Sequence, residues 1–238
     1  MVSELHLGDL SVDLVFKDIK NIHLSVYPPT GRVRIAAPTR ASIDTIRAFA
    51  ISKLGWIRRH QTKFAQQERQ PPREFLDRES HYLWGRRMLL HIVEGQGRPS
   101  IEIEHKKIAL RVPEAVTFEA KVQLLDELYR REARRALRPL AAKWEKILRI
   151  EINHIYLQRM KTRWGSCNPQ KGNIRLNLEL AKKPMECLEY IFLHETLHFF
   201  VPNHGERFVA LLDQHMSNWR TIRQILNDEP LAHSDWKY

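Results

Sequence analysis

Hydrophobic and polar positions follow two periods along this chain, one typical of strands and one typical of helices. Strand-like alternation, together with apolar runs bounded by turn residues, occurs over residues 12–16, 22–26, 33–35, 81–93, 100–104 and 107–112. Ser42 precedes an apolar stripe at helical spacing from Ile46 to Phe64, which predicts a helix capped by that serine. The N-terminal part is therefore expected to be rich in β-structure, with one helix.

A longer helical pattern begins the second half of the chain. Apolar residues recur at helical spacing over residues 117–148, so we expect one long helix, kinked at Pro139. The change of period predicts a β-rich domain with one helix over residues 1–115 and a second domain over residues 116–238. The expected fold class is α+β.

The most specific chemical signal is a pair of histidines four residues apart, His194 and His198, with Glu195 between them. On a helix both imidazoles lie on one face, so they can converge on one metal ion. Pro202 then breaks the helix. Asn203 is the expected N-cap of a long returning helix, with His204 in its first turn and an apolar stripe that continues to Leu226.

Three imidazoles with one open coordination position are the donor set of a catalytic zinc ion. We therefore expect His194, His198 and His204 to bind Zn²⁺, and Glu195 to act as general base toward a zinc-bound water. Glu206 is a second-choice ligand, of the kind that gluzincins use. The alternative is that these histidines are unrelated packing or surface residues.

Further motifs extend the pattern beyond the histidines. They are Met160-Lys161-Thr162-Arg163-Trp164-Gly165-Ser166-Cys167, then Gly172-Asn173-Ile174-Arg175-Leu176-Asn177, and finally Asn203-His204-Gly205-Glu206-Arg207-Phe208. In this order, with the histidine motif, the sequence resembles the YgjP-like metallopeptidase family, which is related to the SprT-like and WLM zinc proteases. The resemblance is strongest over residues 150–227. It implies a zincin-like domain with a small sheet packed on the metal-binding helix, His194, His198 and His204 as ligands, and Glu195 as catalytic acid/base.

The segment around Trp164 predicts two strands joined by a loop rich in Gly, Asn and Pro. In zincins a sheet edge lies above the metal helix, so an extended substrate is expected to pair there, with Arg163, Ser166 or Asn177 in contact with it. The competing interpretation is structural, with Trp164 in the core and Asn177 holding the loop.

Charge and cysteine content bear on partners and location. The net charge is +11, and Arg131, Arg134, Arg135 and Arg138 fall on one face of the predicted long helix, which is compatible with binding nucleic acid or a nucleotide or with a solvated basic face. Two cysteines provide no disulfide framework, and no signal sequence or apolar run long enough for a membrane helix is found. We expect a cytoplasmic protein without membrane contact, and the sequence leaves its oligomeric state open.

Three functions fit these features. The first is a zinc-dependent metallohydrolase, a peptidase acting on a peptide or protein substrate. The second is a metal-dependent nucleotide phosphohydrolase of the nucleoside triphosphate pyrophosphatase type, with Arg163, Arg175 or Lys161 holding phosphate. The third is a non-enzymatic, basic nucleic-acid-binding protein with a structural metal. Glu195 disfavours the third, because a structural metal site has no need of a general base.

Overall fold

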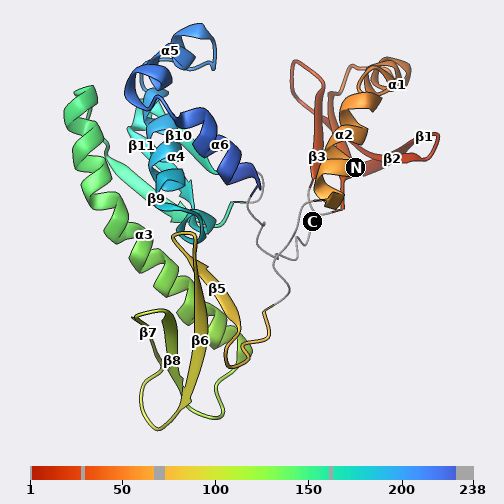
Figure 1. The fold of residues 1–238 in the computed structure, drawn as a ribbon. Helices are drawn as coiled ribbons and strands as arrows, with labels where there is room; N and C mark the ends of the chain where they lie inside the picture. Colours follow the sequence, from red (N-terminus) through yellow and green to blue (C-terminus); the bar gives the residue numbers. More distant parts are fainter. Residues whose placement is uncertain (1, 28–29, 67–72, 161–162, 229–238) are drawn as a thin grey trace. The chain divides into compact units, whose positions relative to one another are not determined.

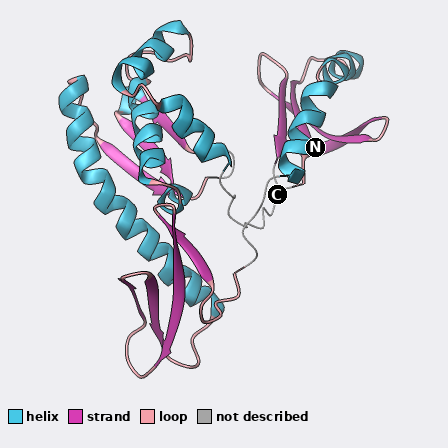
Figure 2. Cartoon of the chain, in the orientation of Figure 1, coloured by secondary structure: helices cyan, strands magenta, loops and turns pink. Residues whose placement is uncertain are grey.

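A computed structural model describes residues 2–27, 30–66, 73–160 and 163–228. The chain divides into two compact units, residues 1–69 and residues 70–238 (Figure 1). The mixed composition of helices and small sheets confirms the α+β fold class (Figure 2).

The first unit is a four-stranded sheet with two helices. Its elements are β1 (Val2–Leu7), β2 (Leu10–Lys17), β3 (His23–Tyr27), β4 (Arg32–Pro38), α1 (Ile43–Ser52) and α2 (Leu54–Gln66). The strand order is β1-β2-β4-β3, with β2 and β4 parallel. Val12, Ile35 and Ile46 are fully buried in its core. Ser42 caps α1 as predicted, because its hydroxyl accepts a hydrogen bond from the backbone N–H of Thr45.

The second unit holds two sheets and four α-helices among the residues that the structure describes. Its first part contains β5 (Ser80–Leu83), β6 (Arg86–Glu94), β7 (Ser100–Glu104), β8 (Lys107–Val112) and α3 (Phe118–Leu148). There follow β9 (His154–Gln158), β10 (Gly165–Asn168), η1 (Pro169–Lys171), β11 (Asn173–Asn177), η2 (Leu178–Lys182), α4 (Met185–Leu197), α5 (Glu206–His215) and α6 (Trp219–Asp228). The strand orders are β5-β6-β8-β7 and β10-β11-β9.

Helix α3 belongs to two hydrophobic cores of this unit. Leu125, Leu128 and Tyr129, on its N-terminal half, are buried against the β5–β8 sheet. Leu137 and Trp144, farther along, are buried with α4 and the three-stranded sheet. Because α3 packs in both cores, residues 70–115 belong to the same compact unit as residues 116–238. The units therefore divide at residues 69 and 70, whereas the sequence pattern placed the division at 115 and 116.

Four further expectations differ from the observed elements. The single helix expected after Ser42 is two helices, α1 and α2, which are separated at Lys53. The strand candidate at 81–93 is a hairpin, β5 and β6, whose turn has Trp84 and Gly85 at positive φ. The long returning helix is two helices, α5 and α6, separated at residues 216–218. Gly205 is the N-cap of α5, so the expectation of Asn203 as cap was wrong and His204 lies just before the helix.

Candidate metal centre

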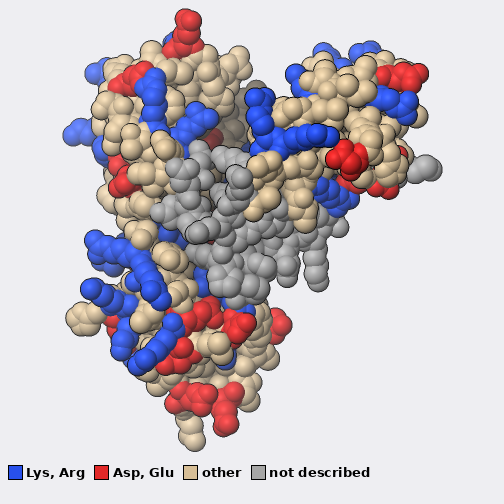
Figure 3. All heavy atoms as spheres, turned by 45° about the vertical axis from the view of Figure 1, so that its right-hand side comes forward, with Lys and Arg blue, Asp and Glu red and all other residues tan. Residues whose placement is uncertain are grey.

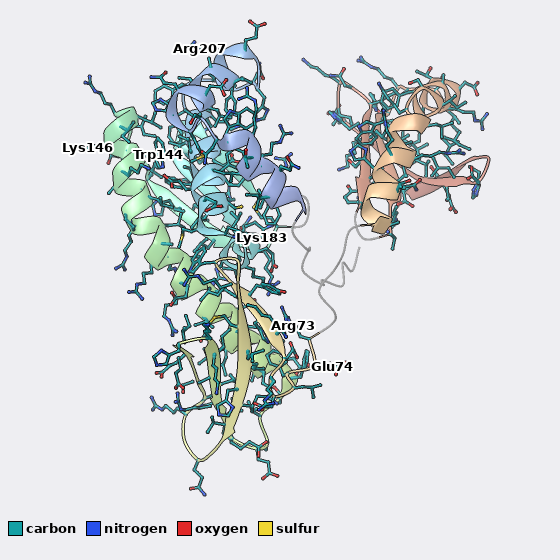
Figure 4. The ribbon with its side chains drawn as sticks, in the orientation of Figure 1. Arg73, Glu74, Trp144, Lys146, Lys183 and Arg207 are labelled. Carbon is teal, nitrogen blue, oxygen red and sulfur yellow. The ribbon has the colours of Figure 1, made fainter. Side chains whose placement is uncertain are left out.

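The buried helix α4 carries two of the three candidate ligands. Its residues Leu188, Phe192 and Leu193 are fully buried, so packing fixes the orientation of the helix. Trp144 points from α3 toward α4, where its Nε1–H donates a hydrogen bond of 3.2 Å to Glu189 (Figure 4). A helix held in this way presents His194 and His198 on one face, one turn apart.

The chain returns His204 to the same place after α4 ends. The ligand atoms of His194, His198 and His204 all lie within 4.8 Å of one another. The Nε2 atoms of His194 and His204 are 2.9 Å apart. The ring of Phe208 packs against all three imidazoles, with centroid distances of 4.9, 4.9 and 4.8 Å. The three imidazole rings therefore converge on one point, and the Phe208 ring packs against them.

The protonation of these histidines suits a metal ion. Burial, followed by the neighbouring imidazoles and the charge of Arg223, lowers the pKa of His194 to about 4. Burial and His198 also lower the pKa of His204. Near neutral pH both rings are therefore neutral, with lone pairs free to bind a cation.

Hydrogen bonds within the cluster also fit a metal. His198 Nδ1 lies 3.0 Å from the carbonyl oxygen of Val201, so an Nδ1–H donor there leaves Nε2 as the ligand atom. A tetrahedral zinc ion separates its ligand nitrogens by about 3.3 Å, close to the spacing of His194 and His204. The residues present thus fit a three-histidine metal site.

Glu195 is enclosed between α4 and the edge strand β10. Only 6% of the residue is exposed, and burial raises the pKa of its carboxyl to about 7, while the nearby charge of Arg163 acts in the opposite direction. A Cβ placed on Gly165 would lie 2.6 Å from Glu195 Oε1, so only glycine fits beside the carboxylate. Cys167 lies on the same face of β10, and burial with the charge of Glu195 raises the pKa of its thiol to about 12. A thiol held protonated in this way is a poor metal ligand.

Strand β10 has one free edge next to this carboxylate. Among the strands that the structure describes it pairs only with β11, and the backbone N–H of Asn177 donates to the carbonyl of Trp164 over 2.8 Å. In an antiparallel pair, backbone groups point alternately toward and away from the partner. The backbone N–H and C=O groups of Gly165 and Cys167 therefore face the free edge.

The three residues expected to contact substrate have different positions. Arg163 is exposed and acts electrostatically on Glu195, which suits a role at the site. Ser166 alternates with Gly165 and Cys167, so its side chain lies on the opposite face of the sheet. Asn177 is 5% exposed, and its amide bonds to the backbone of Met160, Arg163 and Glu179. This placement agrees with the structural interpretation of Asn177 and argues against substrate contact. Lys161 lies outside the described residues.

Sequence reasoning missed the stacked pair of Tyr190 and Trp219 beside the histidines. Tyr190 on α4 packs edge-on against His194 at 6.0 Å and stacks on Trp219 of α6 at 6.2 Å. Asp213 of α5 accepts a hydrogen bond of 2.8 Å from Trp219 Nε1–H. Arg223 lies one turn beyond Trp219. No sequence motif joins these residues, because they meet only after α5 and α6 fold back onto α4.

The basic surface is partly used within the fold. Arg130 donates to the carbonyl of Leu157, and Arg131 to that of Ile101, while Arg134, Arg135 and Arg138 are exposed. Figure 3 shows Lys and Arg side chains grouped on one side of the unit of residues 70–238, above a lower region rich in Asp and Glu.

None of the described helices combines the length and apolarity that a membrane crossing needs.

A buried glutamate beside three converging imidazoles is the arrangement that metallohydrolases use. The chain matches the model of the YgjP-like metallopeptidase domain over residues 20–229. It therefore belongs to the YgjP-like metallopeptidase family, which confirms the resemblance seen in its motifs.

The chain was also compared with solved structures and with curated proteins. Among solved structures, the chain is similar to a crystal structure of the metallopeptidase zymogen of Methanocaldococcus jannaschii jannalysin. The identity is 26%, the match covers 38% of this chain and 87% of that chain, and the TM-score is 0.35. The comparison with curated proteins gave no match.

Proposed function

We propose that this protein is a zinc-dependent peptidase in which His194, His198 and His204 hold the metal and Glu195 is the general base. The observation that carries the proposal is the convergence of three imidazoles beside a buried carboxylate, next to an edge strand. When bound, zinc would polarise the substrate carbonyl and lower the pKa of a water molecule at its open position.

Glu195 carries the proton through the reaction. It takes one proton from the attacking water, whose oxygen forms a bond to the carbonyl carbon while the π electrons of the carbonyl move to its oxygen. The C–N bond then breaks as Glu195 passes that proton to the amide nitrogen. The amine leaves, the water oxygen remains in the new carboxyl group, and Glu195 is again ionised. Burial of the carboxyl supports this role, since a raised pKa makes it a stronger base.

The free edge of β10 favours an extended polypeptide as substrate. The outward backbone groups of Gly165 and Cys167 can pair with a peptide main chain, which would then run past Glu195. A nucleotide has no backbone amides to use this edge. For this reason we propose peptide hydrolysis over nucleotide hydrolysis.

The test is metal content and turnover in the same preparations. Elemental mass spectrometry should find about one zinc per chain in the wild type and in Glu195→Gln, and much less in His204→Ala. A proteome-derived peptide library, read by mass spectrometry, should be cleaved by the wild type alone. Glu186→Gln, an exposed glutamate of the same helix, and His91→Ala, an exposed histidine of β6, serve as matched controls. Equal cleavage by Glu195→Gln would refute the proposed mechanism.

A further inference from the structure

Tyr190 and Arg223 lie next to the histidine cluster and have no assigned role. The Tyr190 ring is held between His194 and Trp219, and the residue is 4% exposed. Its hydroxyl makes no hydrogen bond to any residue that the structure describes. A hydroxyl held in one place without a partner is a donor that a substrate can use.

Arg223 lies on α6, the helix that packs against α4. Figure 1 shows α6 alongside α4, and Arg223 lies one turn after Trp219, whose ring covers Tyr190. Burial is the main influence on the pKa of His194, His204 and Tyr190, lowering the first two and raising that of Tyr190, and the positive charge of Arg223 acts to lower all three. The guanidinium is therefore within electrostatic reach of the three groups. Within the described part of the chain, this guanidinium has no ion-pair partner.

The two arginines near the site act on different groups. Arg163 acts on Glu195, and Arg223 acts on His194 and His204. A reacting carbonyl at the cluster would therefore meet a proton-accepting carboxylate, a hydroxyl donor and a guanidinium. That is the arrangement needed when a neutral carbonyl becomes a tetrahedral oxyanion.

We propose that the Tyr190 hydroxyl and the Arg223 guanidinium stabilise the oxyanion that forms on the substrate carbonyl oxygen when water attacks. This inference rests on the proposed peptidase function. The Tyr190 O–H and the Arg223 N–H groups donate hydrogen bonds to the negative oxygen and keep their own protons, so neither group is consumed. Both interactions strengthen as the charge develops, which lowers the barrier without tightening substrate binding.

The experiment compares Tyr190→Phe, Arg223→Gln and Arg223→Lys with the wild type. Turnover of a peptide identified from the library should show kcat reduced roughly 100-fold in Tyr190→Phe and Arg223→Gln, with KM within about threefold. Arg223→Lys keeps the charge and should recover part of the loss. Zinc content should stay near one per chain, because neither residue is a ligand.

A second readout does not depend on turnover. A phosphinic analogue of the same peptide, in which –P(O)(O⁻)–CH₂– replaces the scissile amide, presents a charged tetrahedral centre. Its dissociation constant, measured by calorimetry, should rise by about the same factor as kcat falls. Affinity for the intact peptide, measured in a Glu195→Gln background, should not change.

Tyr156→Phe and Arg138→Gln are matched controls, because both side chains are exposed and outside the cluster. Unchanged kcat and analogue affinity in the Tyr190 and Arg223 variants of an active enzyme would overturn this inference and leave the peptidase proposal intact. A rise in KM alone would assign the pair to ground-state binding and would also overturn it. A wild type that binds zinc but neither cleaves peptides nor binds the analogue would overturn both proposals.

Discussion

Gly165 leaves the space that the Glu195 carboxylate occupies. Gly165→Ala would place a methyl group 2.6 Å from Glu195 Oε1 and force the carboxylate to move. Because a displacement of about 1 Å can cost on the order of 100-fold in rate, we expect kcat to fall by at least that factor, with zinc content unchanged. Gly95→Ala is the control, since a Cβ there meets no atom within 4 Å. Full activity in Gly165→Ala would show that Glu195 tolerates displacement.

The charge of Arg163 is expected to shift the acidic limb of the pH–rate profile, because it lowers the pKa of Glu195. The base must be ionised, so kcat/KM falls as pH drops through the pKa of Glu195, which burial places at about 7. A cation held by the histidines favours the carboxylate, so in the metal-loaded enzyme the limb lies below pH 7. Arg163→Gln removes a charge that lowers this pKa, and the limb should move to higher pH by about half a unit to one unit. Arg138→Gln should leave the profile in place, and an unmoved limb in Arg163→Gln would exclude the coupling.

Among single residues, the sequence predicted the three histidines and Glu195. Helical spacing brings His194 and His198 together, and the break at Pro202 allows His204 to return. It could not predict the stacking of Tyr190 on Trp219, or the dependence of Glu195 on Gly165. Those contacts join segments about 30 residues apart, and only packing brings them together. Asn177 shows the reverse difficulty, since a polar residue in a motif can serve the loop that carries the motif.

At the level of elements, strand β5 carries a buried histidine that couples pH to stability. His81 is fully buried, its ring nitrogens have no hydrogen-bond partner among the described residues, and its Nε2 is 3.2 Å from Glu79 Oε1. Burial, then the charges of Arg73 before β5 and Lys182 on η2, lower the pKa of His81 to about 4, and Glu79 opposes them. The native protein therefore resists protonation there, whereas the unfolded chain takes the proton near pH 6.5.

The stability contributed by neutral His81 is therefore fully present above pH 6.5 and is lost as pH falls toward 4. Between pH 7 and pH 4.5 we expect the free energy of unfolding, measured with urea, to drop by about 2 to 3 kcal/mol from this group. His81→Phe should lose that part of the pH dependence, while His91→Ala on the adjacent strand should keep it. The same slope in His81→Phe and the wild type would count against the assignment.

The elements themselves were largely predictable where their periodicity is uninterrupted. The helix expected at 117–148 is α3, and the strands expected at 100–104 and 107–112 are β7 and β8. The break between α5 and α6 was not foreseen, because the apolar stripe continues through it. The hydrogen bond from Trp219 to Asp213 spans this break, a tertiary contact that periodicity does not encode.

Helix α3 belongs to two hydrophobic cores, so it limits where the chain can be truncated without unfolding. A chain of residues 70–238 keeps both cores that α3 joins, together with every candidate site residue. We expect it to unfold cooperatively and to bind one zinc ion, as measured by circular dichroism and elemental mass spectrometry. A chain of residues 116–238 would expose Leu125, Leu128 and Tyr129, which pack on the β5–β8 sheet, and should aggregate or unfold. A stable, zinc-binding 116–238 chain would restore the boundary that the sequence pattern indicated.

The stacking of Trp219 on Tyr190 gives the site its own optical reporter. An indole 6.2 Å from a ring that touches His194 lies within the range where a paramagnetic ion such as Co²⁺ quenches fluorescence efficiently. Trp219 is 7% exposed and hydrogen-bonded to Asp213, so its emission should be blue and narrow before metal is added. The chain has six tryptophans, so the contribution of Trp219 is the part of the fluorescence change that Trp219→Phe loses. With that variant as reference, metal loading and the entry of any ligand that displaces Tyr190 can be followed in real time, before a substrate is known.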